Sequence, residues 1–368
     1  MQRNSAIDSV KGFAILLVMI GHCVVLNGLN TSDPFLYDVI KSVQMPLFML
    51  VSGVLAAMPV KKTGAGIGMR KLGARAVSYL LPFFAWFVVV HLYVHGKAGT
   101  LSLIMFLKEL KELLFQTDRG LWFLMTLFVA TVCCMTAQAI ADKIAKSGVR
   151  KAIYFTAVSM LIYILFFVQS RSGNTFLSPA LMVQYFLFYL TGYIASGYGE
   201  CLLLAICPSQ TVREKVAKAE PVLLTLMFAC FVMMAALLEL TAPVDGIVTL
   251  AVQMTASFLG TIACYGIVYR LAQQRQKKTE KRGFLSFVGL YTLEIYVLHF
   301  RFARLLGLSE KGLQLYSPEG IVWVLLAFVL MSILTAVCIM ILQRIPVVSL
   351  LLFGKKHLPI SRKGGQSA

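Results

Sequence analysis

The stretch GIVWVLLAFVLMSILTAVCIMILQ, residues 320–343, contains no charged side chain. A helix needs about 20 apolar residues to cross the hydrocarbon core of a bilayer, so this stretch is long enough to span it. Hydrophobic residues make up 59% of the 368-residue chain. Charged residues make up only 14%, whereas a soluble domain carries about 25%. The sequence therefore predicts an all-α integral membrane protein.

Further apolar runs extend outward from this stretch to the start of the chain. They lie at residues 284–300, 246–269, 221–241, 178–198, 151–169, 120–141, 77–95, 42–58 and 10–29. Basic residues cluster in every second connection between the runs, which is the pattern of cytoplasmic loops. We therefore expect about ten transmembrane helices with both termini cytoplasmic, in a multi-pass protein of the plasma (bacterial inner) membrane. Residues 1–345 would form the transmembrane domain and residues 346–368 a basic cytoplasmic tail.

The net charge of +18 does not indicate a nucleic-acid-binding protein. The basic residues lie in short clusters between apolar runs, where they orient a membrane protein. The eight cysteines lie mostly inside apolar runs and form no C-x-x-C pair. There they behave as small hydrophobic side chains. We expect no nucleic-acid partner, no structural disulfide and no metal.

Three ionisable residues within the predicted spans are candidates for chemistry: His22, Glu294 and His299. Such groups are costly in the hydrocarbon region and are usually functional. Measured from the predicted helix starts, His22 would lie about 18 Å deep and Glu294 about 15 Å deep from the same side. Glu294 could then orient the imidazole of His22 as a general base. Alternatively, backbone or hydroxyl groups satisfy each side chain separately.

A set of cations precedes the first and third spans on the predicted cytoplasmic side. Lys11 comes three helical turns before His22 and shares its helix face. The others are Arg70, Lys71 and Arg75. The orientation of the chain in the membrane is enough to explain many of these charges. It does not explain why Lys11 shares a helix face with His22. Acetyl-coenzyme A fits this arrangement of cations and histidine. Its phosphates would bind the cations, and its thin arm would extend about 16 Å from them to His22.

The connection 96–119 contains the sequence FLKELKELLF at residues 106–115, whose apolar positions recur at helical spacing. It predicts an amphipathic helix at the outer membrane surface. An ordinary loop helix and a substrate lid are both compatible with this pattern, and we favour the loop helix.

Five motifs resemble acyltransferase family 3, a family of membrane O-acyltransferases. One is Arg75 with residues 80–82, which resembles the basic entry to the third helix of that family. Residues 7–15 followed by His22 resemble the first helix of that family, and residues 44–53 resemble its second. Residues 121–124 match a recurrent family element, and residues 291–299 resemble the fucose 4-O-acetylase-like subgroup. The motifs are spread over most of the chain. Two positions depart from the family pattern, since Lys11 and Ser78 stand where arginine is common.

The resemblance implies transfer of an acetyl group from cytoplasmic acetyl-coenzyme A to a sugar hydroxyl. The acceptor would be O-antigen, exopolysaccharide, capsule or a lipid-linked sugar, and membrane lipids would surround the chain. His22 either removes a proton from the acceptor, which we favour, or carries the acetyl group as an acyl-imidazole. We expect contacts on the acceptor side from Trp122, Tyr291, Tyr296 and His299.

Two other classes of protein remain open at this point, a proton-coupled transporter and a structural or sensory membrane protein. No repeat relates the two halves of the chain, as many transporters would show. A structural or sensory role leaves the spacing of Lys11 and His22 unexplained. The sequence does not decide the oligomeric state, for which a homodimer is one option.

Overall fold

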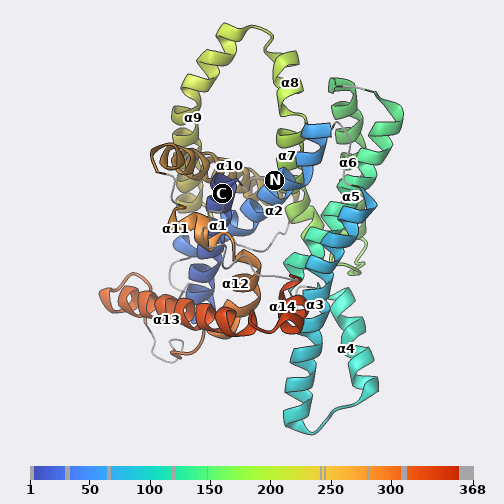
Figure 1. Cartoon of the computed structure of the whole chain (residues 1–368). Helices are drawn as coiled ribbons and strands as arrows, with labels where there is room; N and C mark the ends of the chain where they lie inside the picture. Colours follow the sequence, from blue (N-terminus) through green and yellow to red (C-terminus); the bar gives the residue numbers. More distant parts are fainter. Residues whose placement is uncertain are drawn as a thin grey trace, which may run out of the picture.

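The computed structural model describes residues 4–29, 34–63, 68–117, 121–146, 148–240, 243, 246–279, 282–307 and 313–355. Every regular element in these ranges is a helix, which confirms the expected all-α fold (Figure 1). The long helices are α1 (Ser5–Val25), α2 (Phe35–Thr63), α3 (Met69–Ala98), α5 (Trp122–Ile144), α6 (Gly148–Arg171), α7 (Pro179–Gly197), α9 (Gln210–Leu237), α10 (Ile247–Lys278) and α13 (Pro318–Leu342). The short helices are α4 (Leu103–Phe115), α8 (Gly199–Ile206), α11 (Phe284–Val288), α12 (Thr292–Leu298), the 3-10 helix η2 (His299–Arg301) and α14 (Pro346–Phe353).

Eight helices within the described ranges are long and apolar enough to cross a membrane: α1, α2, α3, α5, α6, α9, α10 and α13. The predicted span 178–198 forms α7, a helix of 19 residues that packs mainly against α2 and is not one of the eight. The membrane character of the chain is thereby supported. The count of ten spans and the cytoplasmic location of both ends remain predictions.

Several helices extend beyond the apolar runs that predicted them. The run 42–58 belongs to α2, which begins earlier at Phe35. The run 221–241 belongs to α9, which begins at Gln210, and α10 continues to Lys278 through a basic segment. Lysine, arginine, glutamine and glutamate are good helix formers. A helix therefore does not stop where its apolar run stops.

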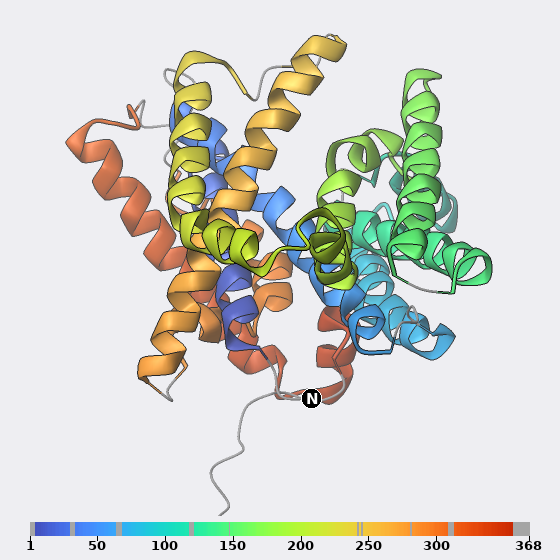
Figure 2. The same cartoon turned by 90° about the horizontal axis from the view of Figure 1, so that it is seen from above.

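Helices α1 and α2 occupy the middle of the molecule. Helices α9 and α10 lie side by side on one side of them, and α5 and α6 lie on the other side (Figures 1 and 2). The start of α2 packs on α1, and its later half packs on α7. Gly53 of α2 lies against the carbonyl of Tyr189, and Gly192 of α7 lies against the carbonyl of Leu50. A Cβ atom at either glycine would overlap the facing backbone. Small residues of this kind let membrane helices approach closely.

A second close crossing ties α1 to the segment that follows α10. Gly12 of α1 lies against the carbonyl of Leu285 in α11. Gly289, immediately after α11, lies against the carbonyl of Asp8. Glycine at both places lets the two backbones touch, and this fixes the segment after α11 against the first half of α1.

The predicted ninth span, residues 284–300, is wrong as a single helix. It is divided into α11 and α12 by a turn that begins at Gly289. Glycine is a poor helix former, and at this position it is also held against α1. With seven residues, α12 is only about 10 Å long, too short to cross a bilayer. Irregular backbone at membrane depth is tolerated where protein covers it, and both Glu294 and His299 are buried here.

The predicted tail, residues 346–368, is partly folded. Its first residues form α14, which packs against α3, and Trp86 Nε1 donates a hydrogen bond to the carbonyl of Leu352 at 3.2 Å. Residues 356–368 lie outside the described ranges. The domain boundary at 345 is still a prediction.

Candidate active site

His22 lies in the last turn of α1, three residues before the helix ends at Val25. The sequence placed it near the middle of its span because the apolar run starts at Val10, whereas the helix starts at Ser5. Its ring centroid is 5.2 Å from that of His299 and 5.2 Å from that of Phe300. The Nδ1 atom of His22 is buried and has no hydrogen-bond partner among the described residues.

His299 begins η2, directly after α12, and its side chain is buried. Its Nδ1 lies 2.7 Å from the carbonyl oxygen of Ile295. A carbonyl can only accept, so Nδ1 carries the proton and donates it. In the neutral ring Nε2 is then an acceptor, and it is buried without a partner among the described residues. The sequence assigned His299 to the acceptor side but did not reveal its contact with His22.

A third buried polar atom without a partner among the described residues lies on α2, against the residue that precedes His22. The Oε1 atom of Gln44 faces Gly21, the residue before His22, and it also has no partner in the described part of the chain. Buried polar groups are nearly always hydrogen-bonded in proteins. The unpartnered ring nitrogens of His22 and His299, whose rings are in contact, can therefore hydrogen-bond a polar ligand.

The expected pairing of Glu294 with His22 is not found. Glu294 has no exposed surface, and its Oε1 is bound by Lys355 Nζ at 2.6 Å and by Gln343 Nε2 at 3.1 Å. The histidine that touches His22 is His299. The break in the predicted ninth span is the physical reason, because α12 turns Glu294 toward the end of α13 and the start of the tail.

A row of aromatic rings leads away from the histidine pair. Tyr296 lies 6.3 Å from His299 and 5.6 Å from Phe123, measured between ring centroids. Phe123 adjoins Trp122, which stacks on Tyr185 at 5.1 Å. The predicted acceptor-side residues Trp122, Tyr296 and His299 thus belong to one row.

Tyr291, the fourth residue predicted on the acceptor side, lies elsewhere. It contacts Phe287 of α11 with ring centroids 5.3 Å apart. It belongs to a buried cluster with Leu298 of α12, Ile339 of α13 and Phe353 of α14. The structure does not bring it to the aromatic row.

Tyr185 also lines a cavity of about 430 Å³ between α2, α6, α7 and α10. Two cations, Lys41 and Arg171, and two amides, Gln184 and Gln253, contribute to its wall. Sequence analysis missed these residues. Lys41 and Arg171 lie near one end of α2 and of α6. Basic residues at the ends of spans can either orient the protein in the membrane or bind a ligand, so the sequence did offer these two as candidates.

The predicted donor-binding cations lie on two helices. Lys11 shares α1 with His22, as expected, and its ammonium is 2.8 Å from the carboxylate of Asp8. Arg70 and Lys71 are exposed on the first turn of α3. Arg75, one turn further on, is half-buried and lies within electrostatic range of Tyr189 in α7. Among the described residues, one group could hold a metal ion, His91 with His95 and Glu109 on α3 and α4.

Comparison with known proteins identifies the family. The family model described as "Acyltransferase domain" (Acyl_transf_3) matches residues 4–343, which include His22, the broken segment and His299. The chain belongs to acyltransferase family 3. This membership supports a membrane acyltransferase and does not favour the transporter alternative.

One relative with a curated description is a nodulation protein, NolL, from Sinorhizobium fredii. The two sequences are 31% identical over 138 residues, which cover 35% of this chain and 36% of NolL. The match thus spans about a third of the length of that relative. No solved structure matches the chain.

Proposed function

We propose that this acyltransferase moves an acetyl group from cytoplasmic acetyl-coenzyme A to a hydroxyl of a cell-surface or lipid-linked glycan, at the plasma (bacterial inner) membrane. The observation that carries the proposal is the contact between His22 and His299, whose buried Nδ1 and Nε2 atoms have no partner in the described structure. Buried titratable groups without partners are candidates for a catalytic role.

The reaction requires a base for the acceptor hydroxyl, and His22 takes this role. Its imidazole removes the hydroxyl proton as the sugar oxygen attacks the thioester carbonyl carbon. A carbon–oxygen bond forms, the carbon–sulfur bond breaks, and the proton passes from His22 to the departing thiolate of coenzyme A. His299, fixed through Ile295, positions the ring of His22 or the acceptor hydroxyl through its free Nε2.

On the donor side, Lys11 and the cations of α3 would bind the phosphates of coenzyme A. Lys11 and His22 lie eleven residues apart on α1, a rise of about 16 Å. This distance suits the pantetheine arm, which connects the phosphates of coenzyme A to the thioester. Arg70 and Lys71 are exposed and therefore accessible to a cytoplasmic ligand under the proposed orientation.

On the acceptor side, the aromatic row and the cavity beside Tyr185 suit a sugar. Aromatic rings present flat apolar surfaces on which the C–H faces of a pyranose stack. The amides of Gln184 and Gln253 can hydrogen-bond sugar hydroxyls. Lys41 and Arg171 suit an acidic sugar or the phosphate of a lipid-linked glycan.

A transfer assay with acetyl-coenzyme A labelled in the acetyl group tests this function. Membranes that contain the chain should move label into the glycan fraction, and mild alkali should release it as acetate, because esters are alkali-labile and amides are not. Membranes with the His22→Ala variant are the control. Label in an alkali-stable product, or no difference between the two membranes, would count against O-acetylation by this chain.

A further inference from the structure

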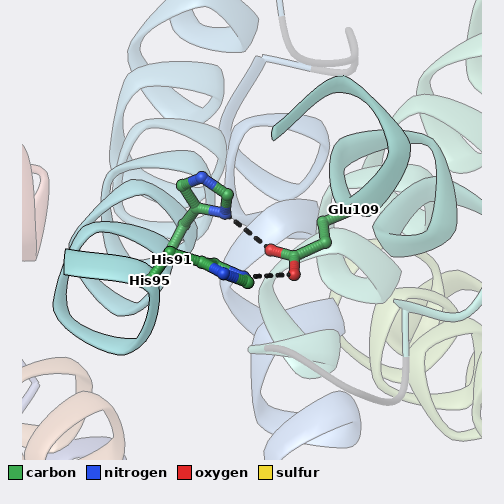
Figure 3. Close-up of side chains that lie close together, drawn as sticks. All are labelled: His91, His95 and Glu109. Carbon is green, nitrogen blue, oxygen red and sulfur yellow. Dashed lines mark hydrogen bonds and ion pairs between the residues drawn. The ribbon is translucent and has the colours of Figure 1, made fainter. Parts of the chain in front are cut away.

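Three side chains with metal-ligating atoms converge away from the residues assigned to acyl transfer (Figure 3). His91 and His95 are one turn apart near the end of α3, and Glu109 comes from α4. Residues four apart lie on one face of a helix. Only a short connection separates the two helices, and α4 folds back against α3 (Figure 1). The amphipathic helix predicted at 106–115 thus has its polar Glu109 turned toward α3.

The carboxylate of Glu109 bridges the two imidazoles. Its Oε2 is 2.6 Å from His91 Nδ1, and its Oε1 is 2.6 Å from His95 Nε2. One ligand atom from each of the three residues lies within 4.8 Å of the other two. Figure 3 shows both rings turned toward the carboxylate.

The surroundings resemble those of metal-bound histidines. The second nitrogen of His95, Nδ1, is 2.8 Å from the hydroxyl of Thr100. Ligating histidines usually hold their other ring nitrogen in this way. His91 is 3% exposed, and its ring packs edge-on against Phe106 at 5.2 Å. The ring of His91 is thus held by packing, and the ring of His95 by an outer hydrogen bond.

We propose that His91, His95 and Glu109 bind a divalent transition-metal ion, of which Zn²⁺ fits best, and that the ion fastens α4 to α3. Two imidazole nitrogens exclude Ca²⁺ and Mg²⁺, which prefer oxygen ligands. Zinc takes histidine nitrogens and carboxylate oxygens at about 2.0–2.2 Å. Donor atoms around a tetrahedral zinc lie about 3.3 Å apart. The 2.6 Å separations would open by less than about 1 Å to admit the ion.

The expectation of no metal rested on the cysteines, which form no C-x-x-C pair. The proposed site uses histidine and glutamate side chains instead. It does not depend on the proposed acetyl transfer, because none of the three residues lies in the row from His22 to Tyr185. The alternative is a metal-free ion pair in which Glu109 accepts a hydrogen bond from each ring. Metal content separates the two directly.

The test uses the full-length protein in detergent, stripped with a chelator and passed through a desalting column. After incubation with ZnCl₂ and removal of free ion, elemental analysis should find about one zinc per chain. The variants His91→Ala, His95→Ala and Glu109→Gln should each weaken zinc binding at least 100-fold in competition with a chromogenic chelator. Thr100→Ala should weaken it about tenfold, the effect of an outer-shell partner.

Glu112→Gln is the matched control, since it makes the same chemical change on the same helix and should leave zinc binding unchanged. Wild-type protein loaded with Co²⁺ should show the visible absorption of a tetrahedral site with nitrogen ligands, a measurement that needs no variant to fold. Wild-type protein that retains no zinc, or His91→Ala and Glu109→Gln variants that bind it as tightly as wild type, would overturn the proposal.

Discussion

The ammonium group of Lys355 lies 2.6 Å from the carboxylate of Glu294, a side chain with no exposed surface. Gln343 donates a second hydrogen bond to the same oxygen, Glu294 Oε1. Lys355 Nζ also donates to the carbonyl of Leu290 at 3.3 Å, in the turn that breaks the segment. The chain beyond α14 is thereby tied to the turn and to α12. These contacts hold Glu294, on the segment that carries His299, against Gln343 and Lys355.

Replacing Lys355 with methionine should destabilise the protein. The carboxylate of Glu294 would remain buried without its cation, which costs about 3–5 kcal/mol for a fully buried pair. Because the Lys355 side chain is 31% exposed, water can partly replace it, and we expect about 1–3 kcal/mol. Thermal unfolding of the purified protein in detergent measures the loss.

The double variant Glu294→Gln/Lys355→Met should unfold at a higher temperature than Lys355→Met alone, since it removes the stranded charge as well. Lys278→Met, at the exposed end of α10, is the control and should unfold like wild type. A double variant no more stable than Lys355→Met would show that the ion pair does not explain the destabilisation.

The orientation of the chain can be checked with topology reporters. Basic residues in alternate connections predict that both termini are cytoplasmic and that the connection after α3 is outside. A phosphatase fused near Ala98 should be active, and one fused at Ala368, outside the described residues, should be inactive. Activity from both fusions would contradict the predicted topology and with it the cytoplasmic donor site.

Losing a donor-binding cation should raise the Michaelis constant for acetyl-coenzyme A. Lys11→Ala and Arg75→Ala should each raise it about tenfold or more, because a hydrogen bond to a charged group is worth about 1.5–3 kcal/mol. Turnover at saturating donor should change much less. Radiolabel transfer at varied donor concentration gives both constants.

Arg150→Ala is the control for a cation at the start of another helix, and its side chain is exposed on α6. It should leave the Michaelis constant unchanged. Equal constants for wild type, Lys11→Ala and Arg75→Ala would place the phosphates of the donor elsewhere.

Much of this fold could be predicted because a helix that spans a lipid bilayer needs an uninterrupted run of about 20 apolar residues. Long apolar runs became helices, and the eleven-residue spacing placed Lys11 and His22 on α1. The break at Gly289 could not be predicted from hydropathy, because the residues on both sides of it are apolar. Its cause is a tertiary contact, the backbone of α1 against Gly289.

The predicted pairing of Glu294 with His22 failed for two reasons, the break at Gly289 and the folding of the first part of the tail. Depth along two straight helices predicted that Glu294 meets His22, but a broken helix turns its side chains differently. The partner of Glu294, Lys355, comes from the segment that was predicted to be a basic cytoplasmic tail. The cluster of His91 and His95 with Glu109 left a readable signal, since the histidines are four residues apart. Its significance depends on α4 folding back, which periodicity does not show.

The contact between His22 and His299 predicts how variants of the two histidines behave. If His22 is the base, His22→Ala should lower turnover by about 10²–10⁴. His299→Ala should lower turnover by about tenfold to a hundredfold with little change in the Michaelis constant for acetyl-coenzyme A, because it positions a reacting group rather than the donor. The double variant His22→Ala/His299→Ala should be scarcely worse than His22→Ala, since residues that act as a unit are not additive.

The variant His299→Gln distinguishes positioning from general loss of packing. A glutamine amide can donate to the carbonyl of Ile295 and present its oxygen where Nε2 stood, so it should recover part of the activity lost in His299→Ala. Membrane yield and thermal unfolding of both variants control for folding. If the losses of the two histidines simply multiply, and glutamine recovers nothing, His299 does not act through His22.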